Sequence, residues 1–355
     1  MARYSLGVLA GDGIGPEVVG SAVTVLEAAT AAVGGVSWEL VRHPMGWEAM
    51  RQHGVALPES TIAALTGCDG WILGPHDSQS YPAAEQAKLN PSGVLRKHFD
   101  LYANLRPARA YPGVPAVRPD LDLVIVRENT EGFYADRNMA VGLGEFMPSP
   151  DLALTVGVFS RRAIERIARV ACDLARARRG KLAIVHKANV LKLSTGLFRD
   201  IGRAVAAEQP EIRCEDYHVD ALAAHLVRRG GDFDVILAEN MFGDILSDLT
   251  GELAGSLGMA GSINAGDRVA MAQAAHGAAP DIAGRGIANP TGVLVSVALL
   301  LRWLADRRAD PVPAAVAARI DAALDTVLRA GVRTPDLGGN ATTANFTGAL
   351  VAAIG

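Results

Sequence analysis

The sequence predicts an α/β fold with a mostly parallel sheet. Short apolar runs alternate along the chain with longer segments of helical period, which is the pattern of strands joined by helices. The length of 355 residues is enough for two domains or one large α/β unit. No internal repeat and no low-complexity linker interrupts the alternation.

The expected elements follow in order from the N-terminus. Residues 4–10 are expected to form a strand, and residues 16–33 a helix that opens with Pro16, a residue common in the first turn. Val36, Trp38 and Leu40 alternate with polar residues, which predicts a half-buried strand over 36–43. Short apolar runs predict buried strands at 70–74, 123–126, 182–185 and 235–237. Helical spacing predicts helices at 160–178, 195–208, 245–257, 291–304, 313–328 and 342–354.

Two irregular stretches separate these elements. The Pro- and Gly-rich residues 107–119 are expected to cross between lobes. Residues 139–150 are punctuated by Gly and Pro and are expected to protrude as an arm or loop.

Composition excludes several classes of protein. Hydrophobic residues make up 50% and charged residues 20% of the chain, which is ordinary for a folded protein. A net charge of −4 gives no electrostatic reason to expect nucleic acid or a membrane surface as a partner. The apolar run at 293–301 is well short of a membrane span, and no signal peptide is expected. Three separated cysteines, Cys68, Cys172 and Cys214, favour a reducing cytoplasm.

A glycine-rich turn at residues 11–17 joins the first expected strand to the first expected helix. A dinucleotide fingerprint needs a third glycine three residues after Gly13, and Pro16 holds that place. No acidic residue stands at the expected strand end about 20 residues further on. These residues therefore predict a structural turn and not a Rossmann-type nucleotide site.

Three aspartates are candidate metal ligands. Asp244 and Asp248 stand four residues apart, so they share one face of a helix and repel each other unless a cation lies between them. A divalent ion with oxygen ligands suits such a pair, although a solvated acidic face is the commoner explanation of the spacing alone. Asp220 ends a strand-like run, where sites in α/β sheets gather.

Arginine, lysine and tyrosine supply further candidates. Arg96, Arg106 and Arg127 could bind a substrate with more than one carboxylate, because guanidinium groups bind carboxylates in pairs of hydrogen bonds. Lys187 follows an expected strand, where a desolvated lysine can act as a base. Tyr134 could donate a proton, or simply be a core aromatic. The eight histidines show no metal-binding spacing.

Six segments carry a resemblance to a known family. Together they are similar to the motifs of the β-decarboxylating dehydrogenases, which include isocitrate, 3-isopropylmalate, homoisocitrate, tartrate and D-malate dehydrogenases. Each segment alone is weak, but six in the family's order over nearly the whole chain make chance improbable. The segments are GDGIGPE at 11–17, LYANLRP at 101–107, VRENTEG at 126–132, KANVL at 187–191, NMFGDILSDL at 240–249 and HGAAPDIAGRGIANP at 276–290.

The resemblance implies a two-lobed, non-Rossmann α/β fold. The first lobe would combine residues 1–102 with 255–355 and bind the cofactor, and the second would be residues 103–254. It also implies a homodimer in which an arm near residues 139–155 clasps the partner. The active site would lie in the cleft between the lobes.

The resemblance also implies roles for particular residues. Asp244 and Asp248 would bind Mg²⁺ or Mn²⁺, with Asp220 and Lys187 reaching in from the other subunit. Lys187, directly or through a relay, would remove the substrate's hydroxyl proton, and Tyr134 would protonate the enolate left after loss of carbon dioxide. The residues expected at the substrate are Arg96, Arg106, Arg127, Asn90, Ser92 and Asn189. The residues expected at NAD are His276, Gly277, Ala278, Ala279, Asp281, Ile282 and Asn289.

Asp281 favours NAD over NADP. NAD-using members of the family have Asp at this place, whereas bacterial NADP-using isocitrate enzymes have Lys followed by Tyr. An Asp carboxylate accepts hydrogen bonds from ribose hydroxyls and repels a 2′-phosphate.

Three departures from the family's patterns bear on the substrate. Gln273 stands three residues before His276, where the family often has Glu. Residues 129–132 read Asn-Thr-Glu-Gly, where leucine-pathway enzymes usually have Leu-Thr-Gly-Gly. Asn90 and Ser92 precede Arg96 in a segment where isopropyl-specific enzymes place leucines and isocitrate enzymes place Ser before Asn.

The segment before Arg96 therefore favours a polar or small 3-substituent, as in isocitrate, tartrate or malate, over isopropyl. Tartrate, D-malate and homoisocitrate dehydrogenases remain alternatives. A non-catalytic regulatory subunit is an alternative of another class, but the expected ligands and both proton-transfer residues are intact, which favours an enzyme.

Overall fold

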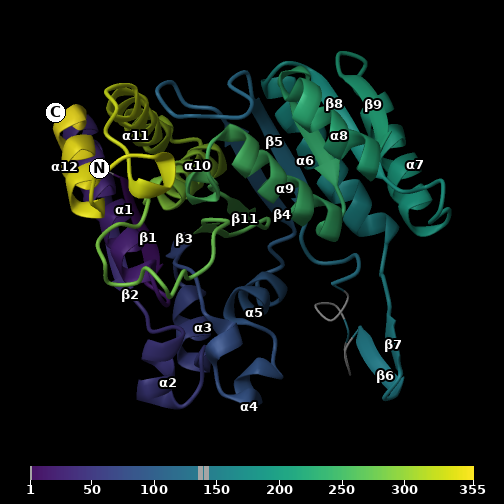
Figure 1. Ribbon diagram of the computed structural model, residues 1–355, viewed down its shortest axis with the longest axis horizontal. Coiled ribbons are helices and arrows are strands. Elements are labelled where there is room, and N and C mark those ends of the chain that lie inside the picture. The colour runs from purple at the N-terminus through teal and green to yellow at the C-terminus, as the bar shows by residue number, and fades with distance from the viewer. Residues whose placement is uncertain (1, 135–138, 140–143) are drawn as a thin grey trace. The chain divides into compact units, whose positions relative to one another are not determined.

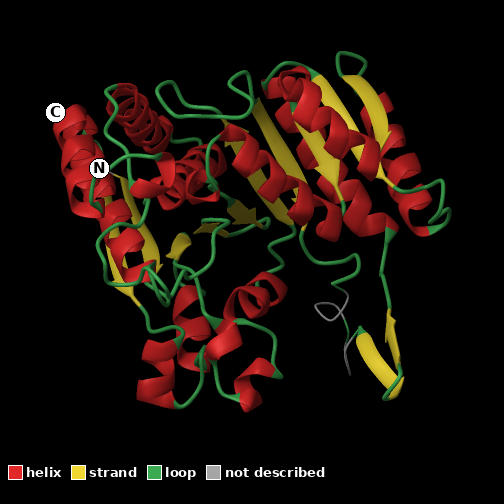
Figure 2. Ribbon diagram, viewed as in Figure 1, coloured by secondary structure: helices red, strands yellow, loops and turns green. Residues whose placement is uncertain are grey.

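The computed structural model describes residues 2–134, 139 and 144–355, and the chain forms two compact units (Figure 1). Unit 1 contains Met1–Leu95, Tyr111–Ala116 and Gly255–Gly355, and unit 2 contains Arg96–Ala110 and Val117–Ala254. Each unit combines helices with a strand array (Figure 2), so the predicted α/β class with a mostly parallel sheet is confirmed.

The strands of unit 1 lie in the order β2-β1-β3-β12-β11. Neighbours in this series are parallel except β11 and β12, which are antiparallel. The central strands are buried on both faces, which explains why they appear in the sequence as continuous apolar runs. Their bounds are β1 (Ala2–Leu9), β2 (Val36–Arg42), β3 (Gly70–Leu73), β11 (Ile263–Ala265) and β12 (Ala270–Gln273).

Four long helices pack together in unit 1: α1 (Gly15–Val33), α10 (Thr291–Arg308), α11 (Pro311–Arg329) and α12 (Thr343–Ile354). By length and composition α1 could cross a membrane, but it packs against the other three and buries one side of its surface, as a core helix does. The shorter helices are α2 (Trp47–His53), α3 (Glu59–Leu65), α4 (Ala83–Gln86) and α5 (Pro91–His98), whose last turn belongs to unit 2, with 3₁₀ turns at Ser78–Ser80, Leu257–Met259 and Pro335–Leu337.

The strands of unit 2 lie in the order β4-β5-β10-β8-β9. All neighbours are parallel except β4 and β5. Helices α6 and α7 pack on one face of these strands, and α8 and α9 on the other. The bounds are β4 (Ala103–Arg109), β5 (Asp122–Glu128), β8 (Lys181–His186), β9 (Arg213–His218), β10 (Val235–Ala238), α6 (Arg161–Ala177), α7 (Ser194–Ala207), α8 (Val219–Arg229) and α9 (Asn240–Ala254), with a 3₁₀ turn at Gly230–Asp232.

Alternation along the strands divides the interior of unit 2 into two hydrophobic clusters. Leu182 and Ile184 of β8 pack with the residues of α6 and α7. Ala183 and Val185, which alternate with them along the same strand, pack with the residues of α8 and α9. Because successive side chains of a strand point to opposite faces, one apolar run serves both clusters.

A separate hairpin joins β6 (Glu145–Ser149) to β7 (Leu152–Thr155). Every residue of both strands is exposed, including Phe146, Met147 and Leu152. The hairpin falls within the segment expected to form an arm, of which residues 140–143 lie outside the described part of the chain.

Some predicted boundaries are wrong. Helix α9 begins at Asn240, five residues before the predicted start, because the Asn-Met-Phe-Gly segment opens the helix and does not precede it. The stretch expected to cross between lobes is predicted to start at residue 107, but strand β4 continues to Arg109. Arg106 and Pro107 interrupt the apolar character of that strand, so the sequence shows no apolar run there.

Candidate active site

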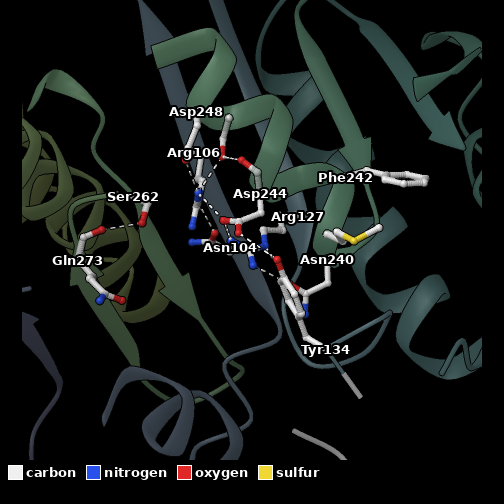
Figure 3. Close-up of polar contacts among 12 residues, drawn as sticks. Asn104, Arg106, Arg127, Tyr134, Asn240, Phe242, Asp244, Asp248, Ser262 and Gln273 are labelled. Carbon is white, nitrogen blue, oxygen red and sulfur yellow. Dashed lines mark hydrogen bonds and ion pairs between the residues drawn. The ribbon is translucent and has the colours of Figure 1, made fainter. Parts of the chain in front are cut away.

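Two carboxylates on α9 face two buried arginines of unit 2 (Figure 3). Asp244 and Asp248 lie one helical turn apart. Arg106 Nη1 lies 3.1 Å from Asp244 Oδ1 and 3.7 Å from Asp248 Oδ1. Arg127 Nη1 donates to Asp244 Oδ1 at 2.5 Å. The predicted metal pair and two of the three predicted substrate arginines therefore share one cluster.

The two arginines come from adjacent antiparallel strands. Arg106 lies on β4 and Arg127 near the end of β5, directly opposite Asn104. Asn104 Oδ1 accepts from Arg106 Nε at 2.6 Å, and Ser247 Oγ accepts from Arg106 Nη1 at 2.7 Å. Burial and the nearby Arg127 lower the pKa of Arg106 to about 10, although the two carboxylates oppose the shift. Arg106 therefore stays a cation at neutral pH and can bind an anionic ligand.

The chemistry of this cluster suits a divalent cation. Burial raises the pKa of Asp248, and repulsion from Asp244 adds to the rise against the attraction of Arg106. A hard cation with oxygen ligands, such as Mg²⁺ or Mn²⁺, would relieve that repulsion. In the part of the chain that the structure describes, no three His, Cys, Asp or Glu side chains form a potential metal site. Asp220 therefore does not complete the pair within one protomer.

Tyr134 belongs to the same cluster. Its hydroxyl donates to Asp244 Oδ2 at 3.4 Å, and the Arg127 guanidinium carbon lies 5.9 Å from its ring centroid. A phenol held beside these groups can deliver a proton to a bound molecule, which is what the predicted proton donor requires.

Lys187 and Asp220 form a second cluster in unit 2. Lys187 directly follows β8, and its Nζ lies 2.6 Å from Asp220 Oδ1. The expectation that Asp220 ends a strand is wrong by two residues, since β9 ends at His218 and Asp220 lies in the first turn of α8. The hydrogen bond from Lys187 lowers the pKa of Asp220. Asn189 is exposed two residues after Lys187.

His186, which the motifs did not single out, holds the turn that presents Lys187. Its Nε2 lies 2.8 Å from Asp216 Oδ2, and its Nδ1 accepts from Ala188 N at 3.1 Å. Burial lowers the pKa of His186 against the attraction of Asp216, so the ring is neutral at pH 7. Thr195 Oγ1 also accepts from Lys187 N at 3.1 Å. The KANVL motif begins one residue after His186, so the motif does not include this histidine.

The segment before Arg96 forms α5. Asn90 Oδ1 accepts from Gly93 N at 2.8 Å and from Ser92 Oγ at 3.0 Å, so Asn90 caps the helix. Ser92 Oγ also lies 3.0 Å from His76 Nε2, and Arg96 is buried in the last turn. The Asn90 carbonyl is thus engaged in capping, and His76 joins the polar groups of this segment.

The predicted cofactor loop follows β12 in unit 1. His276 Nδ1 lies 3.1 Å from the Gly277 carbonyl, whereas His276 Nε2 is buried and has no hydrogen-bond partner among the described residues. Burial lowers the pKa of His276, so the ring is neutral at pH 7. Gly277 and Asp281 are exposed. A buried polar nitrogen without a partner costs free energy unless a ligand supplies one, so this loop fits a bound dinucleotide.

The glycine-rich turn packs against this loop. Ile14 N donates to Ala278 O at 2.9 Å. A Cβ on Gly13 would lie only 2.0 Å from Ala278 O, and Gly13 has a φ of +57°. Ala279 has a φ of 40°, and its carbonyl accepts from Ile282 N at 3.2 Å. The turn therefore supports the loop through close backbone packing, a role that requires glycine.

Asn289 and Gln273 lie in the interior of unit 1. Asn289 Nδ2 donates to Asp336 Oδ2 at 2.9 Å, and its Oδ1 accepts from Thr291 N at 3.0 Å at the start of α10. Gln273 ends β12, and its main-chain carbonyl accepts from Ser262 Oγ at 2.6 Å (Figure 3). Gln273 is buried, and as a neutral amide it adds no charge there.

The sequence and the fold are both similar to those of known dehydrogenases. Residues 5–350 match the family model described as isocitrate/isopropylmalate dehydrogenase. The chain is 43% identical to the isocitrate/homoisocitrate dehydrogenase of Thermus thermophilus, over 99% of this chain and 98% of that protein. It is 41% identical to the 3-isopropylmalate/3-methylmalate dehydrogenase of Methanocaldococcus jannaschii, over 96% of each. The crystal structure of isocitrate dehydrogenase from Methylococcus capsulatus matches with a TM-score of 0.87 at 36% identity, covering 99% of both chains.

Proposed function

Because the chain belongs to the isocitrate/isopropylmalate dehydrogenase family, we propose that it oxidises and decarboxylates a 3-substituted malate with NAD⁺ and Mg²⁺ or Mn²⁺. The observation that carries the proposal is the cluster of Arg106 and Arg127 against Asp244 and Asp248, with Tyr134 beside it. Guanidinium groups bind the carboxylates of a malate, and carboxylates bind the cation that such a substrate chelates.

The chain's own residues account for binding and proton transfer. Arg106 and Arg127, with Arg96, bind the malate portion and fix its orientation. Asp244 and Asp248 would hold the divalent cation, which would supply a lowered pKa at the substrate hydroxyl, and NAD⁺ on the cofactor loop would supply the hydride acceptor. Lys187, reaching in from a second copy of the chain, removes the hydroxyl proton. After carbon dioxide leaves, Tyr134 protonates the enolate carbon.

The proposed substrate carries a polar or small 3-substituent. The segment next to Arg96 offers the Asn90 amide, the Ser92 hydroxyl and the His76 ring, and it has no pair of leucines. A polar substituent could hydrogen-bond to the Asn90 amide and the Ser92 hydroxyl, whereas an isopropyl group offers these side chains no hydrogen bond. Isocitrate is therefore proposed ahead of 3-isopropylmalate.

The proposed cofactor is NAD and the proposed assembly is a cytoplasmic homodimer with shared active sites. Asp281 is exposed on the cofactor loop, where its carboxylate would accept from ribose hydroxyls and repel a 2′-phosphate. The apolar residues of the β6–β7 hairpin, exposed in the single chain, supply a surface that a partner would cover.

A spectrophotometric panel tests the proposal. The purified protein is given Mg²⁺, NAD⁺ or NADP⁺, and one of isocitrate, homoisocitrate, 3-isopropylmalate, tartrate or D-malate. We expect NADH formation with a polar acid, a clear preference for NAD⁺, and loss of activity in excess chelator. No turnover with any acid would favour a regulatory subunit, and a preference for 3-isopropylmalate would overturn the substrate assignment.

A further inference from the structure

We propose that Asn240 is a positioning residue. It fixes the orientation of Arg127, and the position of the segment from Glu131 to Tyr134, relative to Asp244. The inference rests on the proposed function and deepens it. Asn240 is the first residue of α9 and is fully buried, one helical turn before Asp244. Figure 3 shows its side chain beside Arg127, among the residues of the cluster.

The Asn240 amide joins two elements that carry proposed functional groups. Its Oδ1 accepts from Arg127 Nε at 3.0 Å and from Arg127 Nη2 at 2.7 Å. Its Nδ2 donates to the Glu131 carbonyl at 2.9 Å. With that edge of the guanidinium held by Asn240, the remaining Nη1 donates to Asp244. A single amide therefore sets the orientation of the Arg127 fork and the position of the chain at Glu131.

Close packing leaves this arrangement little freedom. A Cβ on Gly243 would lie 2.7 Å from Arg127 Cγ, so α9 lies directly against the arginine stem. A Cβ on Gly132, whose φ is +84°, would lie 3.1 Å from Asn240 Cβ. Two residues after Gly132, the Tyr134 hydroxyl reaches Asp244 Oδ2. The segment from Glu131 to Tyr134 is thus fitted against the first turns of α9.

The chemistry at position 240 selects a neutral amide. An aspartate there could accept from Arg127 but could not donate to the Glu131 carbonyl, so two oxygens would face each other without a proton between them. Its negative charge would also offset the charge of Arg127, which the proposed function needs for the substrate anion. Asparagine orients the arginine and leaves its charge available.

The test uses steady-state kinetics and calorimetry on Asn240→Asp and Asn240→Ala, with the acid that the wild type prefers. We expect Asn240→Asp to raise KM for the acid about tenfold or more, because its negative charge offsets the charge of Arg127 and it cannot donate to the Glu131 carbonyl. KM for NAD⁺ should change less than about twofold. Titration of Mg²⁺ and the acid without NAD⁺ should show the same loss of affinity. Thr250→Ala is the matched control, because Thr250 is equally buried on α9 and, among the described residues, its hydroxyl donates only to the Ser247 carbonyl.

A double-mutant cycle identifies the group through which Asn240 acts. Lysine at position 127 lacks the Nε and Nη2 pair that Asn240 accepts from. We therefore expect Asn240→Ala to raise KM for the acid much less in an Arg127→Lys background than in the wild type. Equal effects in both backgrounds, or equal effects on the KM for the acid and for NAD⁺ as in a general loss of structure, would overturn the inference.

Folding and function are judged separately. Thermal melting shows whether each variant is folded, and Asn240→Ser replaces any variant that is not, because serine keeps one donor and acceptor. If the wild type turns over no acid of the panel, the proposed function fails, and the positioning role is then judged by the titration alone. An Asn240→Asp variant that binds the acid as tightly as the wild type would overturn it.

Discussion

Charged side chains are buried around Asp244 to a degree that folding alone does not favour. Arg127 is 1% exposed and Arg106 is 8% exposed. Burying a charge costs several kcal/mol unless partners and hydrogen bonds offset the loss of hydration. Asn104, Asn240 and Ser247 supply those bonds without adding charge. The arginines thereby remain available to an anionic ligand.

Variants of Lys187 and Tyr134 should affect the two proposed proton transfers separately. Lys187→Met removes the proposed base, and we expect kcat to fall about 10²–10⁴-fold, the usual contribution of a general base. Tyr134→Phe should keep part of the oxidation, because water can protonate the enolate slowly. NADH formation measures the oxidation, and incorporation of deuterium into the product from deuterated solvent measures protonation of the enolate carbon. A Lys187→Met variant with the wild-type rate would contradict the assignment.

Glu239 should make stability depend on pH. Burial raises its pKa to about 7, against hydrogen bonds from the backbone of Phe242 and Met241. The unfolded chain has a glutamate pKa of about 4.3, so the native state holds a proton that the unfolded state has lost between these values. This contribution to stability is therefore present below about pH 4 and is lost as pH rises through about 7.

Replacing Glu239 by Gln removes that titration. The free energy of unfolding of Glu239→Gln, relative to the wild type, should increase from pH 5 to pH 8 by up to about 1.4 kcal/mol per unit of pKa shift. Urea unfolding at both pH values measures the difference. A relative free energy that stays constant with pH would contradict the prediction.

At the scale of elements, the contact of Gly13 with Ala278 connects the glycine-rich turn to the cofactor loop. Gly13→Ala places a Cβ 2.0 Å from Ala278 O at a positive φ, so we expect about 1–3 kcal/mol of destabilisation and a raised KM for NAD⁺. Gly20→Ala is the control, because Gly20 lies within α1 with no atom near its would-be Cβ. It should stabilise the protein by about 0.4–1 kcal/mol. Thermal melting and NAD⁺ kinetics test both.

Helix α5 offers a test of substrate choice. Ser92→Leu removes a hydroxyl that bonds to Asn90 and adds apolar surface, so kcat/KM should shift toward 3-isopropylmalate at the expense of isocitrate. A leucine at position 93 is a poorer test, because a Cβ on Gly93 would lie 2.8 Å from Leu89 Cγ. The ratio of kcat/KM for the two acids measures the shift. An unchanged ratio would show that Ser92 does not determine which 3-substituent the protein prefers.

Elements with strong periodicity were predictable, and those formed by polar residues were not. The strand at 70–73 and the helix at 161–177 emerge from apolar spacing within a residue or two. Strand β4 was missed because it carries Arg106 and Pro107, which antiparallel pairing with β5 accommodates. The i, i+4 spacing placed Asp244 and Asp248 on one helix face, as the structure has them, but the tertiary contacts of His186 and Asn240 are encoded by no local pattern.

At the scale of the whole molecule, subunit complementation tests the proposed shared sites. Lys187→Met and Asp244→Asn homodimers should each be inactive. If Lys187 serves the partner's site, a mixed dimer has one site with both defects and one intact site. Random reassembly of equal amounts should then restore about a quarter of the wild-type activity. No recovery, with mixed dimers verified by mass, would place both residues in one site of one protomer.

The route of the chain between its two units limits how the protein can be divided. The chain passes from one unit to the other after residues 95, 110, 116 and 254. The longest continuous piece of unit 2, residues 117–254, lacks β4, so as a separate fragment it would leave an edge of β5 without its partner. Such edges recruit other chains and aggregate. A stand-alone unit 2 would have to start at Arg96 and replace Tyr111–Ala116 by a short turn, so neither unit can be transplanted into another protein as one uninterrupted stretch of gene.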